Sequence, residues 1–177
     1  MVARAFAIIA IAFVSLVVAS PCAAQQPEQQ RGPSTPQERG QAVNLTRFLE
    51  DDPLNEKAPE ARRWLFKWLA DVPDITITVC PEFLKPIMGK DKNYSSEILG
   101  QLIYGSAAFI IENPDSASDE AAVYLAGLES SLKVYESILK TKPKATWAFL
   151  DGLVEKRNKQ ELDDYVRDIL SKGKCKK

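Results

Sequence analysis

A helical repeat of apolar residues between Ala121 and Leu139 limits the possible folds of this chain more than any other feature. Its members alternate at spacings of four and three: Ala121, Leu125, Leu128, Leu132, Tyr135 and Leu139. This spacing places them along one side of a helix of about 23 residues that ends before Pro143, as in a coiled-coil seam. Because three heptads are the minimum for a coiled coil, we expect the seam to pack within the chain.

A second segment, Ser95–Glu112, is apolar on most of its faces, which is typical of a helix in the centre of a fold. Gly100, Gly105 and Ser106 lie in this segment and would let neighbouring helices approach closely. Shorter periodic segments follow the same 3.6-residue pattern: residues 41–49, residues 59–69, the stretch with Trp147, Leu150 and Val154, and residues 162–170. The sequence therefore predicts an all-α fold, a compact array of about five to six helices with one long central helix.

Two helix starts have recognisable caps. Ser116 and Asp119 precede the long helix, and Asn158 with Glu161 has the spacing of a capping box before the last helix. We therefore expect the last helix to begin directly after Asn158.

Residues 74–80, DITITVC, form the only stretch with strand-like alternation. A single strand has no sheet partner within the chain, so the stretch is either an extended connector packed on helices or an edge that pairs with another chain. A kinked helix is a further alternative. We expect the connector.

The first 24 residues resemble a secretory signal peptide, with Arg4 before an apolar stretch that is shorter than the roughly 20 residues that span a bilayer. Lipidation of Cys22 would require a small residue before it, where this chain has Pro21. Cleavage after Ala24 is therefore expected, which predicts a periplasmic or secreted protein without a stable membrane anchor. Residues 25–41 are rich in Gln and Pro and predict a disordered tether, followed by a single helical domain over residues 42–177.

The predicted cleavage leaves two cysteines, Cys80 and Cys175. An even number in an oxidising compartment favours one disulfide, which would place the end of the last helix beside residues 74–80. Two free thiols are the alternative.

Charge and composition exclude several functions. The chain carries 23 Lys and Arg against 24 Asp and Glu, so it has no excess positive charge for binding nucleic acid. It has no histidine, which excludes a Ser-His-Asp triad and an HExxH zinc site. We expect no cofactor and assign no catalytic, cofactor-binding or metal-binding residue.

Two clusters invite a site hypothesis. Trp64, Phe66 and Trp68 could line a ligand pocket, but the helical spacing favours a place in the core. Glu50, Asp51 and Asp52 come nearest to a group of catalytic carboxylates, and a solvated loop before Pro53 also explains them.

Two stretches resemble known families over very short lengths. Glu129 and Ser130 are similar to the Glu-Ser pair of lytic transglycosylases, which are helical exported enzymes, although the glycine-containing motif expected downstream is absent and Glu136 with Ser137 repeats the pair. Residues 131–143 resemble the second helix of a tetratricopeptide repeat, without a recurrence at about 34 residues.

A longer stretch resembles small periplasmic immunity proteins, which bind and block secreted cell-wall hydrolases. The resemblance rests on Cys80-Pro81, on QLIYGSAAFIIENPD at residues 101–115 and on the Ala-rich helix that follows. We therefore expect an exported, non-catalytic protein that binds another envelope or secreted protein. An immunity-type inhibitor of a secreted cell-wall hydrolase and an envelope-associated hydrolase using carboxylates are the two alternatives.

Overall fold

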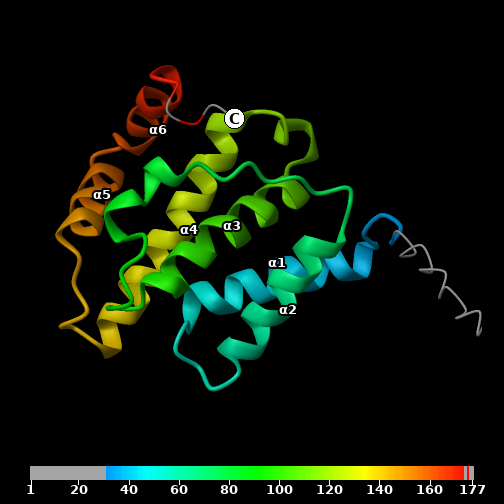
Figure 1. The fold of residues 1–177 in the computed structure, drawn as a ribbon, viewed down its shortest axis with the longest axis horizontal. Coiled ribbons are helices and arrows are strands. Elements are labelled where there is room, and N and C mark those ends of the chain that lie inside the picture. The colour runs from blue at the N-terminus through cyan, green and yellow to red at the C-terminus, as the bar shows by residue number, and fades with distance from the viewer. Residues whose placement is uncertain (1–30, 174, 176–177) are drawn as a thin grey trace, which may run out of the picture. The chain divides into compact units, whose positions relative to one another are not determined.

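The computed structural model describes residues 31–173 and residue 175, which form an all-α fold (Figure 1). Its α-helices are α1 (Pro36–Asp51), α2 (Ala58–Asp71), α3 (Ser95–Glu112), α4 (Glu120–Thr141), α5 (Ala148–Asn158) and α6 (Leu162–Ser171). Three short 3-10 helices, η1 (Pro81–Phe83), η2 (Lys85–Ile87) and η3 (Pro114–Ser116), complete the elements, and this part of the chain contains no strand. The expected signal peptide and the first part of the expected tether lie outside the described residues.

The two apolar segments of the sequence form the centre of the fold. Helices α3 and α4 pack against each other along most of their lengths, and α4 also contacts α1, α5 and α6 (Figure 1). The predicted seam of α4 is buried at Leu128, Leu132 and Tyr135. Tyr124 and Ile138, which lie outside the seam, are buried as well, because α4 has neighbours on several sides. The predicted long central helix is confirmed. None of the described helices is long and apolar enough to cross a membrane.

Small residues set the distance between α3 and α4. A Cβ atom on Gly105 would lie 3.2 Å from the Cα atom of Gly127, and one on Gly127 would lie 2.5 Å from the carbonyl oxygen of Leu102. Ser106, also on this contact, is buried and donates a hydrogen bond to the carbonyl oxygen of Val123. The close approach predicted from Gly105 and Ser106 is therefore present between these two helices.

Helix α1 begins earlier than the sequence analysis predicted. It starts at Pro36, within the segment expected to be disordered up to residue 41, so that boundary was wrong. Thr35 caps the helix by accepting a hydrogen bond from the backbone N–H of Glu38, whose carboxylate in turn accepts from the backbone N–H of Thr35. This capping box and Pro36 in the first turn stabilise a start that has few apolar residues.

The predicted capping box of the last helix was also wrong. Asn158 is the final residue of α5, and Glu161 precedes α6 without a side-chain capping bond. Backbone hydrogen bonds end α5 instead, from the N–H of Glu161 to the oxygen of Lys156 and from the N–H of Gln160 to the oxygen of Arg157. Gln160 has φ 61°, the left-handed conformation common after a helix end. By contrast, Asp119 caps α4 as expected. Ser116, the other expected capping residue, is the last residue of η3, and its backbone oxygen accepts from the N–H of Asp119.

Residues 74–80, hereafter the connector, form the predicted link between α2 and η1 (Figure 1). Ile75 is buried against the cluster that includes Leu65 and Trp68 of α2. At the other end, Cys80 forms the predicted disulfide with Cys175, with the two Cα atoms 5.0 Å apart. The bridge therefore holds the chain beyond α6 beside the end of the connector.

Candidate functional site

The three carboxylates predicted as the nearest approach to a catalytic group do not form one site. Glu50, near the end of α1, is 6% exposed, whereas Asp51 and Asp52 are exposed. Because successive residues of a helix point in directions about 100° apart, only one of the three faces the interior. The fold therefore buries Glu50 and leaves Asp51 and Asp52 in solvent.

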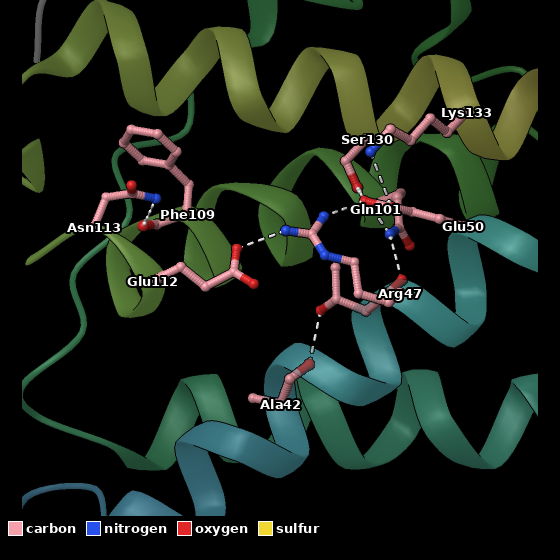
Figure 2. Close-up of polar contacts among 10 residues, drawn as sticks. Ala42, Arg47, Glu50, Gln101, Phe109, Glu112, Asn113, Ser130 and Lys133 are labelled. Carbon is pink, nitrogen blue, oxygen red and sulfur yellow. Dashed lines mark hydrogen bonds and ion pairs between the residues drawn. The ribbon is translucent and has the colours of Figure 1, made fainter.

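Glu50 lies in a buried polar network between α1 and α4 (Figure 2). Its Oε1 atom accepts hydrogen bonds from Arg47, at 2.8 Å, and from the hydroxyl of Ser130, at 2.6 Å. Its Oε2 atom accepts from the ammonium group of Lys133, at 3.2 Å. Both carboxylate oxygens are therefore occupied, and two cations balance the buried charge.

Helix α3 joins the same network. The amide of Gln101 donates to the hydroxyl of Ser130, at 2.9 Å (Figure 2). It also donates to the carbonyl oxygen of Thr46 in α1, at 3.1 Å. Arg47 also reaches Glu112 at the end of α3, at 2.6 Å. Three helices are thus linked through side chains that satisfy each other, which is the condition for burying polar groups without a large cost.

This geometry gives Glu50 a structural role. A general acid or base must contact the substrate, and a carboxylate that is 6% exposed with both oxygens bonded cannot do so without breaking the network. The bonds of Glu50 and Gln101 run from α1 to α4 and from α3 to α1, so the network fixes the position of α1 on the central helix pair.

In each Glu-Ser pair that resembles lytic transglycosylases, the serine contacts residues of other helices and not the glutamate before it. Ser130 hydrogen bonds to Glu50 and not to its neighbour Glu129. Glu136 pairs with Arg157 of α5, at 2.7 Å, while Ser137 donates to the carbonyl oxygen of Asp51. Neither serine hydroxyl donates its hydrogen bond to the glutamate that precedes it in the sequence.

A second buried polar group lies where α5 begins. The hydroxyl of Tyr135 donates to Asp151, at 2.6 Å, and accepts from the backbone N–H of Trp147, at 2.9 Å. Burial, followed by the hydrogen bond to Asp151, raises the pKa of Tyr135 to about 12. The tyrosine therefore stays a neutral donor and holds the start of α5 against the central helix.

A concave surface lies between α1 and α2, and we call it the α1–α2 groove. It has a volume of about 340 Å³ and is lined by Gln41, Leu45 and Phe48 of α1, by Lys57 at the start of α2, and by Glu60, Ala61 and Trp64 of α2. Ala61 is only 5% exposed and closes the groove toward the core. The larger apolar side chains on either side remain half-buried.

The three aromatic residues of α2 have separate environments. Trp68 is 3% exposed and belongs to the core, as its spacing predicted, and Trp64 stacks on it with ring centroids 5.6 Å apart. Trp64 itself is half-buried and lines the groove, so the core prediction holds only in part for this residue. Phe66 points away from both and is 66% exposed.

Sequence reasoning missed the half of the groove that α1 contributes. The only signal was the spacing of three between Leu45 and Phe48, which is too short a pattern to distinguish a groove from a core face. Among the described residues, no group of three or more His, Cys, Asp or Glu side chains is arranged to hold a metal ion.

Comparison with known proteins adds no family. No family model matches the sequence, and neither a curated protein nor a solved structure matches it.

Proposed function

We propose that this chain is an exported protein that binds another envelope or secreted protein through the α1–α2 groove. The observation that carries the proposal is the groove itself, a concave surface of about 340 Å³ between two helices with Leu45, Phe48 and Trp64 half-buried along it. Binding sites are typically concave and mostly apolar, with a few polar groups that orient the ligand.

The composition of the groove suits a protein partner. Aromatic side chains are enriched in the centres of protein interfaces, where they bury a large area with few rotatable bonds. Lys57 and Glu60 give the rim one charge of each sign. A partner with apolar side chains next to an oppositely charged pair would therefore complement the surface.

Export is supported by two independent features. The N-terminal segment resembles a signal peptide, and the Cys80–Cys175 disulfide is of the kind that persists in oxidising compartments.

The proposal is tested with tagged mature protein used to capture partners from the native envelope fraction, with mass spectrometry of what is retained. Leu45→Glu places a charge in the groove, and Met88→Glu places the same charge on an apolar side chain that is 43% exposed outside it. We expect a partner that is retained by the wild type and by Met88→Glu and lost from Leu45→Glu.

Charge reversal at the exposed rim provides a variant with little risk to the fold. Lys57→Glu should weaken retention of the same partner, while circular dichroism shows unchanged helix content for all variants. Capture of no specific protein, or of one that both groove variants retain fully, would contradict the proposal.

An immunity-type inhibitor is a more specific form of this proposal. The stretch that resembles immunity proteins contacts α2, which forms one wall of the groove. The hydroxyl of Tyr104 in this stretch donates a hydrogen bond to the carbonyl oxygen of Arg62 in α2, at 3.2 Å. Under this proposal, the mature protein inhibits peptidoglycan cleavage by a secreted hydrolase encoded next to it, and Leu45→Glu abolishes the inhibition. The hydrolase alternative is not supported by Glu50, whose carboxylate is fully paired.

A further inference from the structure

Residues 75–79 of the connector have unpaired backbone groups. Within residues 31–173, none of their N–H or C=O groups takes part in a backbone or side-chain hydrogen bond. Backbone groups in folded proteins are nearly always paired, either with protein or with water. These residues therefore resemble the edge strand of a sheet that lacks its neighbour.

Both ends of the connector are fixed. The carboxylate of Asp74 accepts hydrogen bonds from the backbone N–H of Ser34, at 2.8 Å, from its hydroxyl, at 2.7 Å, and from Arg39, at 2.7 Å. At the other end, Cys80 is bound to Cys175. A segment held at both ends loses little conformational entropy when it pairs, so these anchors favour association.

The connector presents two different sides. Ile75, Ile77 and Val79 line a hollow of about 180 Å³ together with Phe66 of α2, and Val79 and Phe66 are 51% and 66% exposed. Thr76 and Thr78 line a second hollow of about 190 Å³, together with Tyr124. The hydroxyl of Tyr124 is buried and has no hydrogen-bond partner within the described part of the chain.

The charges around the connector permit contact between two copies. Residues 75–79 carry no charge. The acidic groups next to them in the sequence are paired, Asp74 with Arg39 and Asp71 with Lys67, the latter at 2.6 Å. Glu120 of α4 lines the hollow beside Thr76 and Thr78. The pairing residues therefore bring no charge of their own against the second copy, and Glu120 is the acidic group that the interface has to accommodate.

The connector sequence also complements itself. In an antiparallel pair centred on Ile77, Ile75 lies opposite Val79 and Thr76 lies opposite Thr78. Pairs of β-branched residues and pairs of threonines are favourable neighbours across antiparallel strands. A two-fold axis produces such pairs twice, once on each side of the centre.

We propose that residues 75–79 pair in antiparallel fashion with the same residues of a second copy of this chain, and that Phe66 and Val79 of both copies cover the flanks. This interface uses a surface other than the α1–α2 groove, so it does not depend on the proposed function. Stable interfaces begin near about 1,200 Å² of buried surface, and a two-stranded ladder of five residues in each copy is short for one. The dimer is therefore weak and depends on protein concentration.

Sedimentation of the purified mature protein over a wide concentration range tests the proposal. We expect a monomer–dimer equilibrium in the wild type. Val79→Lys places a charge on the paired edge at an exposed position and should raise the dissociation constant at least about tenfold, because lysines on edge strands oppose pairing. Met88→Lys is the matched control and should leave the dissociation constant unchanged.

Hydrogen exchange provides a second measurement that does not rely on a variant. Amide exchange within residues 75–79 should slow as the protein concentration rises, whereas exchange in α5 should not change. A protein that stays monomeric at every concentration, or a dimer that Val79→Lys does not weaken, would overturn the proposal. Either result would leave capture through the groove intact, because Leu45→Glu tests that surface separately.

Discussion

At the scale of single residues, polar side chains join parts of the chain that are distant in sequence. Glu50 and Ser130 are 80 positions apart and meet at 2.6 Å, and Asp74 lies 40 positions from Ser34. Charge-assisted hydrogen bonds of this kind are stronger than neutral ones. Each therefore fixes how one segment sits on another.

Asp74 makes stability depend on pH. The hydrogen bond from the Ser34 hydroxyl, together with those from the Ser34 backbone and Arg39, holds the pKa of Asp74 well below its ordinary value, although partial burial opposes the shift. A group whose folded pKa is lowered stabilises the protein above its unfolded pKa, near about 4, and loses that contribution as the pH falls.

We expect Asp74→Asn to lower the free energy of unfolding by about 1 kcal/mol at neutral pH, since the site is partly exposed to solvent. The difference between wild type and variant should shrink as the pH falls below about 4, because the unfolded wild-type chain then binds a proton that the folded protein takes up only at still lower pH. Urea unfolding of both proteins at neutral and at acidic pH measures this difference. A difference that stays constant over this range would show that the charge of Asp74 contributes nothing.

At the scale of elements, glycine has opposite consequences in different helices. Gly127 of α4 faces the backbone of α3, whereas nothing lies within 4 Å of the position that a Cβ atom would take on Gly152 of α5. Alanine is the better helix former at both sites. Only the tertiary contact distinguishes the two positions.

Gly127→Ala should therefore destabilise the protein by about 1 to 3 kcal/mol, because the added methyl group meets the carbonyl oxygen of Leu102 and overpacks the helix contact. Gly152→Ala is the control and should stabilise by about 0.5 to 1 kcal/mol. Thermal and denaturant unfolding of the two variants provide the comparison. If both variants changed the free energy of unfolding equally and in the same direction, α3 and α4 would accommodate the added methyl group without loss of stability, contrary to this prediction.

At the scale of the whole molecule, the disulfide joins segments 95 positions apart. Chain-entropy arguments give about 4 to 5 kcal/mol for a loop of this length, and measured values are often smaller. The apolar face of α6 packs on the core independently of the bridge, since Val166 is fully buried and Ile169 is 6% exposed.

Reduction should accordingly lower the melting temperature and leave most of the helical circular dichroism signal in place at low temperature. The double variant Cys80→Ala/Cys175→Ala should behave like the reduced protein and should not respond to reductant. Thiol titration of the unreduced, unfolded mature protein should find no free thiol. Two free thiols, or loss of all helix on reduction, would contradict this account.

Much of the fold could be predicted from the sequence because the pattern that indicates a helix lies within the helix's own residues. The 3.6-residue period of apolar residues identified the helical class, and the segment Ser95–Glu112 was predicted with the bounds that α3 has. The pairing of Cys80 with Cys175 followed from the number of cysteines left after the expected cleavage. The start of α1 was missed because its capping box depends on polar residues and not on an apolar stripe.

The candidate site was decided by tertiary structure. A periodic pattern states which side of its own helix a residue occupies, but not which residue of a distant helix it meets. That second relation depends on the distance and rotation between helices, which small residues such as Gly105 and Gly127 set. For this reason the sequence alone determined the helical class, the two central helices, the connector and the disulfide. Only packing decided that Glu50 is buried against Ser130 and that Trp64 borders a groove with Leu45.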